Sequence, residues 1–136
     1  MARLTRSGSP RRGFTLIELM IVMTIVSVLV ALAAPLYQKA VIRSRETVLK
    51  QNLSTIRLVI DEYTYDKGKA PQSLEDLVRE GYLRQVPYDP MTGANTSWRV
   101  IMEDAATTIS QSEPGIYDVR SGSEKKSLEG TSYNEW

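Results

Sequence analysis

The chain has 136 residues, of which 42% are hydrophobic and 24% are charged; its formal net charge is +1, and it contains neither cysteine nor histidine. This length and composition suit one globular domain and exclude disordered, collagenous and disulfide-rich chains. Without cysteine and histidine, thiolate nucleophiles, Cys/His zinc sites and triads with an imidazole base are excluded, so the composition favours a protein that is not an enzyme.

The charges are distributed unevenly along the chain. Residues 1–13 contain four arginines and no acidic residue, whereas residues 14–136 contain 13 of the 17 Lys and Arg residues and all 16 Asp and Glu residues. A nucleic-acid-binding protein would have its basic excess on the folded part, so we expect no nucleic-acid binding. A short basic stretch before an apolar segment is typical of a membrane-spanning segment whose basic end stays on the cytoplasmic side.

An apolar segment covers residues 14–34, in which 17 of 21 residues are apolar and the exceptions are Thr15, Glu18, Thr24 and Ser27. As a helix it would rise about 31 Å, enough to cross a hydrocarbon core of about 30 Å. Thr and Ser hydroxyls can bond to helix carbonyls, but a carboxylate in such a segment needs a partner. Glu18 is therefore a candidate functional residue.

Three other interpretations of this segment exist. A buried core helix of this length would need a much larger protein to cover it. A cleaved secretory signal is supported by the A-x-A pattern of residues 31–33, but such signals have an apolar region of about 7–15 residues and this one contains a carboxylate. The third interpretation is a plain signal anchor in which Glu18 has no role.

The junction decides between them, because residues 11–18 read Arg-Arg-Gly-Phe-Thr-Leu-Ile-Glu. It resembles the N-terminal signal of type IV prepilins and type II secretion pseudopilins, and Pro35 lies where that family's helix often has a proline. The resemblance implies that residues 1–13 are a leader, which a prepilin peptidase removes between Gly13 and Phe14 before the Phe14 amine is N-methylated. It also implies that residues 14–35 form a transmembrane and assembly helix.

The cleavage would give Glu18 a partner. The segment contains no cation, but cleavage creates an α-ammonium group at Phe14, which remains charged after methylation. In a filament, Glu18 of one subunit can pair with the amine of its neighbour and set the axial register between them. Pairing with its own Phe14 amine is the alternative.

Beyond Pro35, which we expect to kink the helix without ending it, a helical stripe continues. Its apolar members are Ile42, Leu49, Leu53, Ile56, Ile60 and Tyr63. The opposite face is predicted to be a solvated surface formed by Arg43, Glu46, Lys50, Arg57 and Asp61.

Shorter elements follow after Gly68. A second helix is predicted over residues 74–78, with Ser73 as N-cap and Gly81 as stop. Strands are predicted over residues 98–102 and 115–119, flanking a Thr/Ser-rich connection. This layout resembles the α+β pilin-like fold, in which a long N-terminal helix packs on a small antiparallel sheet. Residues 81–90 and 115–123, together with Trp136, are similar to major, G-type pseudopilins.

Two departures from that family are visible. Major pseudopilins usually have an acid-rich C-terminal loop that binds calcium, but residues 121–131 offer only Glu124 and Glu129 as carboxylate ligands, beside Lys125 and Lys126. Since calcium needs six to eight converging oxygens, a solvated loop without metal is favoured there. The absence of cysteine also removes the C-terminal disulfide loop of type IVa pilins, which favours a pseudopilin.

We therefore expect a non-enzymatic filament subunit of a type II secretion pseudopilus, whose assembly drives protein export across the outer membrane. The expected partners are copies of itself, the prepilin peptidase, other pseudopilins and an inner-membrane assembly platform. The chain would cross the inner membrane once with its N-terminus cytoplasmic and residues 36–136 in the periplasm. The alternatives are a type IV pilus subunit for motility, adhesion or DNA uptake, and a signal-anchored or secreted small binding domain. The sequence leaves open whether the subunit is major or minor.

Overall fold

The structure, a computed structural model, describes residue 8, residues 12–104 and residues 113–136. The chain divides into two compact units, Met1–Gln38 and Lys39–Trp136, and we call the second the globular unit. Helix α1 (Leu16–Lys67) contributes residues to both units.

Helix α1 is 52 residues long and contains Pro35 in its interior, so the helix continues past the proline as predicted. It begins two residues later than the predicted start at Phe14. The kink at Pro35 stays a prediction.

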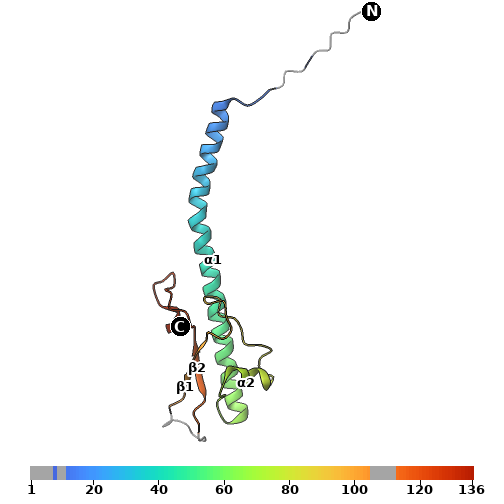
Figure 1. Ribbon diagram of the computed structural model, residues 1–136, viewed down its shortest axis with the longest axis vertical. Helices are drawn as coiled ribbons and strands as arrows, with labels where there is room; N and C mark the ends of the chain where they lie inside the picture. The colour runs from blue at the N-terminus through green and yellow to red at the C-terminus, as the bar shows by residue number, and fades with distance from the viewer. Residues whose placement is uncertain (1–7, 9–11, 105–112) are drawn as a thin grey trace, which may run out of the picture. The chain divides into compact units, whose positions relative to one another are not determined.

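The globular unit combines the C-terminal part of α1 with α2 (Leu74–Arg79), β1 (Arg99–Met102), β2 (Ile116–Arg120) and the 3-10 helix η1 (Tyr133–Glu135) (Figure 1). The two strands are antiparallel, with Arg99 opposite Arg120 and a bulge between Ile101 and Met102. This confirms the α+β fold with a small antiparallel sheet, and both strands lie within one residue of their predicted bounds. The predicted Thr/Ser-rich connection falls mainly on residues 105–112, outside the described residues.

Helix α2 is fixed at both ends by the residues that precede and follow it. The Ser73 hydroxyl accepts a hydrogen bond from the Asp76 main-chain N–H, and the Asp76 carboxylate accepts one in return from the Ser73 N–H at 3.0 Å. Gly81 adopts a φ of 85°, which a residue with a side chain rarely adopts. The predicted cap and stop are confirmed, and Asp76 completes a capping box.

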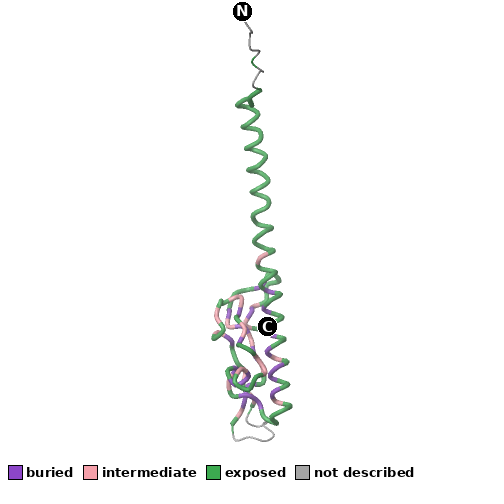
Figure 2. The backbone as a smooth tube through the Cα atoms, turned by 90° about the vertical axis from the view of Figure 1, so that its right-hand side faces the viewer, coloured by how far each residue is buried: buried purple, intermediate pink, exposed green. Residues whose placement is uncertain are grey.

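One face of α1 forms the centre of the core. Leu49, Leu53, Ile56, Ile60 and Tyr63 are buried, as the apolar stripe predicted, and Figure 2 shows buried positions recurring along this part of the helix. Ile42 is the exception, because its side chain is 38% exposed. From the other elements the core receives, among others, Leu77, Trp98, Ile116, Val119 and Tyr133.

Two of the predicted solvated positions on α1 were wrong. Glu46 is buried, and Arg57 is partly buried, with its guanidinium Nε 2.8 Å from the Asp118 carboxylate. The predicted solvated loop at residues 121–131 is also wrong in part, because Ser121, Ser123 and Ser127 are buried. Both α1 side chains are contacted by residues far along the chain, since Leu128 binds Glu46, and β2 and Trp136 bind Arg57.

Ile56 and Leu58 are a matched pair for testing this core. Ile56 is 0% exposed, whereas Leu58 is 67% exposed on the same helix. We expect Ile56→Ala to lower the free energy of unfolding by about 2–5 kcal/mol, because it removes buried methyl groups and leaves a cavity. Leu58→Ala should change it by less than about 0.5 kcal/mol. Urea unfolding of the detergent-solubilised chain, followed by tryptophan fluorescence, measures both; equal effects would contradict the assigned core.

Candidate functional site

The predicted cleavage bond lies in an accessible, non-helical stretch. Residues 12–15 precede α1 and are exposed, and the Phe14 side chain is 86% exposed. A side chain added at Gly13 would meet nothing within 4 Å, so no packing within the described chain requires a glycine there. A glycine requirement at this position would therefore have to come from an external partner.

The start of α1 is fixed by Thr15. Its hydroxyl accepts a hydrogen bond from the main-chain N–H of Glu18 at 3.3 Å, which satisfies one of the free N–H groups of the first helical turn. The spacing Thr-x-x-Glu is that of a capping box, a signal that our sequence analysis missed.

The same cap positions Glu18. Its side chain is exposed and lies in the first turn of α1, where the partial positive charge of the helix N-terminus favours a carboxylate. Glu18 therefore has a local stabilising environment in the single chain, in addition to any partner in an assembly.

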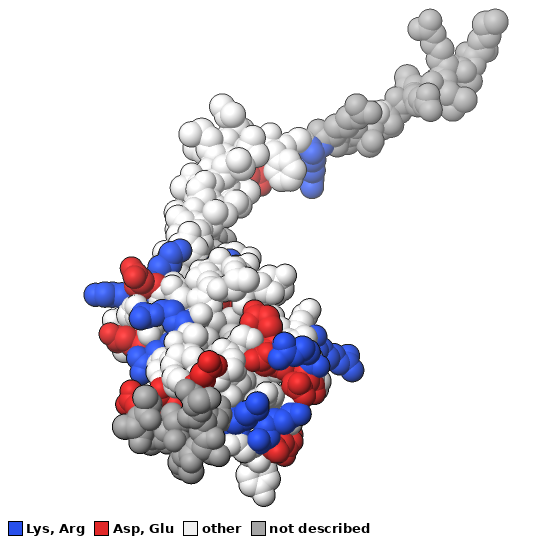
Figure 3. Space-filling view, turned by 60° about the horizontal axis from the view of Figure 1, so that its bottom comes forward, with Lys and Arg blue, Asp and Glu red and all other residues white. Residues whose placement is uncertain are grey.

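Residues 16–34 of α1 present a continuous apolar surface, and all of them are exposed. The hydroxyls of Thr24 and Ser27 donate to the carbonyls of Met20 and Met23 at 2.8 and 2.7 Å. Both hydroxyls therefore have a hydrogen-bond partner within the helix, as expected. Figure 3 shows this part of the molecule as an almost uncharged surface. Among the described residues, α1 is the one helix long and apolar enough to cross a membrane.

A second polar arrangement, which the sequence analysis did not find, lies within the globular unit. The buried carboxylate of Glu46 accepts hydrogen bonds from the main-chain N–H of Leu128 at 2.9 Å and from the Tyr133 hydroxyl at 2.8 Å. The carboxylate of Asp89, 0% exposed, accepts from the Ser121 hydroxyl and from the main-chain N–H groups of Gly122 and Met91. Asp89 lies in the stretch that resembles G-type pseudopilins, but nothing in its sequence context predicted its burial.

The two calcium candidates, Glu124 and Glu129, are both exposed. Within the described residues, no three acidic side chains gather closely enough to hold a metal ion. The donors at residues 121–131 thus do not fit a calcium site formed by acidic side chains.

The Glu46–Tyr133 hydrogen bond predicts a pH dependence of stability. Burial, and then the hydrogen bond to Glu46, raises the pKa of Tyr133 from 10.0 to about 12. Because the folded chain holds the phenol proton more tightly than the unfolded chain, this contribution is fully present below pH 10.0 and is lost as the pH rises to about 12. In urea unfolding, the free energy of unfolding of the wild type should fall relative to that of Tyr133→Phe as the pH rises through this window. A constant difference would contradict the assignment.

Comparison with known proteins finds one matching family model and several similar proteins. Residues 8–34 match the family model described as the prokaryotic N-terminal methylation motif. The chain is similar to type II secretion system core protein G of Pseudomonas aeruginosa, with 34% identity over 94 residues covering 57% of this chain and 66% of that protein. For core protein G of Escherichia coli, the identity is 29% over 101 residues, covering 62% of this chain and 70% of that protein.

Type IV pilins are similar over a shorter stretch. The type IV major alpha-pilin of Moraxella bovis is 38% identical over 66 residues, which cover 48% of this chain and 41% of the pilin. The match therefore spans just under two thirds of the first secretion protein and less than half of this pilin. No solved structure matches the chain significantly.

Proposed function

We propose that this chain, which carries the prokaryotic N-terminal methylation motif and is similar to type II secretion core protein G and to type IV pilins, is the structural pseudopilin of a type II secretion system. The observation that carries this proposal is the extent of the similarity. The matches to core protein G take in 57% and 62% of this chain and 66% and 70% of those proteins. The match to the alpha-pilin takes in 48% of this chain but only 41% of the pilin.

In this proposal the chain is stored in the inner membrane and then polymerised. Residues 16–34 cross the bilayer, the arginine-rich residues 1–13 stay cytoplasmic, and the globular unit is periplasmic. The prepilin peptidase cuts between Gly13 and Phe14 and N-methylates Phe14. An inner-membrane platform then adds subunits to a periplasmic filament, in contact with other pseudopilins. The role is structural rather than enzymatic.

Glu18 is the proposed assembly residue. In a filament core, an unpaired carboxylate would cost several kcal/mol. The charged Phe14 amine of a neighbouring subunit can remove this cost, and it can do so at only one axial offset. The helix N-terminus already favours the carboxylate in the single chain, so pairing adds to a position that is partly stabilised beforehand.

The mature N-terminus tests the processing step. Intact mass and fragment sequencing of the protein from a host with an active prepilin peptidase should give a chain that starts at Phe14 with one added methyl group. Gly13→Ala should leave most of the protein uncut. A mature chain that starts at Ala34 would indicate a secreted domain instead, and an uncut Met1 would indicate a simple anchor.

A pair of variants separates the pairing role of Glu18 from its place in the helix cap. Glu18→Gln keeps the main-chain N–H that Thr15 binds but removes the charge, whereas Thr15→Val removes the capping hydroxyl and keeps the charge. We expect normal processing in both. Cross-linked polymer should fall at least about tenfold for Glu18→Gln, since tenfold corresponds to only about 1.4 kcal/mol, and much less for Thr15→Val. Equal losses would mean that Glu18 acts through the cap alone.

A type IV pilus subunit is the second candidate, and the pilin homologues favour it. The location of the polymer discriminates between them. A short filament retained in the periplasm, whose loss stops protein export, supports the pseudopilin; long fibres on the cell surface support the pilus.

A further inference from the structure

Residues 121–136 are bound to the rest of the globular unit by carboxylates from two distant parts of the sequence. Asp89, in the loop before β1, binds the beginning of this C-terminal segment through the Ser121 hydroxyl and the Gly122 N–H. Glu46, on α1, binds its middle through the Leu128 N–H and the Tyr133 hydroxyl. We call these two carboxylates and their four donors the carboxylate clasp.

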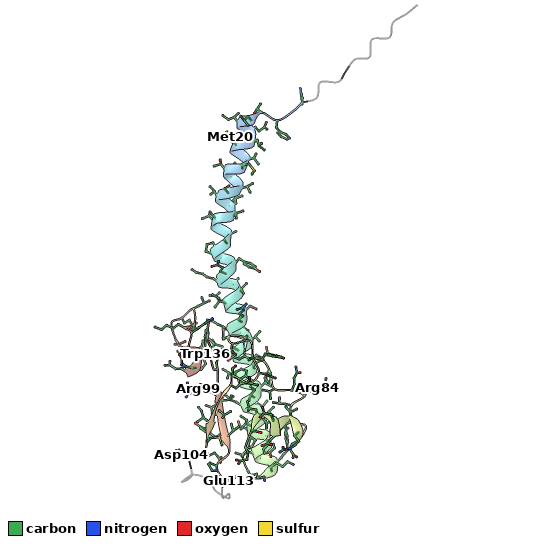
Figure 4. The ribbon with its side chains drawn as sticks, in the orientation of Figure 1. Met20, Arg84, Arg99, Asp104, Glu113 and Trp136 are labelled. Carbon is green, nitrogen blue, oxygen red and sulfur yellow. The ribbon has the colours of Figure 1, made fainter. Side chains whose placement is uncertain are left out.

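The end of the segment is held by the same face of α1. Lys50 lies over the Trp136 ring with its Nζ 4.6 Å from the ring centroid, and the Arg57 guanidinium donates to the Trp136 carbonyl at 2.9 Å. Trp136 also donates from its indole N–H to Thr131 and packs edge-on against Tyr133. Figure 4 shows Trp136 beside α1.

We propose that the carboxylate clasp organises the C-terminal segment without a metal ion. The globular unit then folds, and keeps this segment packed against α1, independently of calcium. In this arrangement each acidic side chain lies inside the protein and binds N–H and O–H donors of the segment. In an acid-rich calcium loop, by contrast, acidic side chains of the loop itself converge on a cation.

The hydrogen-bond donors account for both buried charges. Neither Glu46 nor Asp89 takes part in an ion pair among the described residues, but each accepts at least two hydrogen bonds. Hydrogen bonds to a charged acceptor are stronger than those between neutral groups, and they compensate for the loss of hydration. No buried side-chain oxygen or nitrogen is left without a partner in the described part of the chain.

Several loop oxygens that could serve as cation ligands accept hydrogen bonds within the segment. The Ser127 hydroxyl pairs with that of Thr131, and the Thr131 carbonyl accepts from the Ser127 N–H at 2.7 Å. The Lys125 carbonyl accepts from the Tyr133 N–H. Beside them, the exposed ammonium groups of Lys125 and Lys126 oppose a cation.

The backbone at Gly122 adds a geometric constraint to the clasp. A Cβ atom built on Gly122 would lie 2.0 Å from the Ser97 carbonyl oxygen, so the segment approaches the backbone at Ser97 as closely as a glycine allows. This approach places the Gly122 N–H against Asp89.

The test uses the full-length protein in detergent micelles and two readouts. Thermal unfolding is followed by tryptophan fluorescence in CaCl2 and in EDTA, since both tryptophans lie in the globular unit. Limited trypsin digestion after the exposed Lys125 and Lys126 reports opening of the segment. The variants are Glu46→Gln and Asp89→Asn in the clasp, and the double variant Glu124→Gln/Glu129→Gln as a control that removes two exposed carboxylates.

For the wild type we expect the same unfolding midpoint and the same slow cleavage in CaCl2 and in EDTA, and the control should behave identically. Each clasp variant should lower the midpoint by about 5 °C or more and speed cleavage, with or without calcium. If a clasp variant does not fold, Tyr133→Phe gives a milder loss of one donor. A calcium-dependent rise of the wild-type midpoint that Glu124→Gln/Glu129→Gln abolishes would overturn the proposal, as would clasp variants that match the wild type. The result does not depend on whether the chain forms filaments.

Discussion

Helix α1 exposes all of its side chains over residues 16–34 and buries an apolar stripe over residues 49–63. The two parts therefore need different surroundings, and the other elements of the globular unit cover only the second. An α-helix satisfies its backbone hydrogen bonds internally, so one continuous helix can meet lipid along one part and a packed core along another. The buried stripe needs a cover, which α2, the two strands and the C-terminal segment supply. The exposed part needs a covering of another kind, which the membrane or neighbouring subunits would give.

Features encoded in short stretches of sequence were predicted well. The N-terminal signal is a linear motif, the second helix begins at a recognisable cap, and the two strands are short β-branched runs between turn residues. The errors arose where contacts join residues far apart in the chain. Glu46 and Arg57 fall on the polar side of the helical pattern, yet their partners Leu128 and Trp136 lie 82 and 79 positions away. Periodicity along a helix contains no information about a segment that returns from so far along the sequence.

The buried acids of the globular unit differ in kind from Glu18. Glu46 and Asp89 are held by donors of their own chain, which makes them part of a fixed interior. Glu18 lies in the first turn of α1, and its side chain has no hydrogen-bond or ion-pair partner among the described residues. The contrast separates acids that complete a fold from an acid that is available to a second molecule.

The hydrogen bonds of Thr24 and Ser27 within α1 have a consequence for moving a subunit between the membrane and a filament. Since each hydroxyl bonds to a carbonyl of its own helix, moving this segment between lipid and a protein core breaks no hydrogen bond in either direction. In the proposed filament cycle, the transfer is then reversible at little enthalpic cost. Within that proposal, these two side chains would not oppose a return of the subunit from the filament to the bilayer.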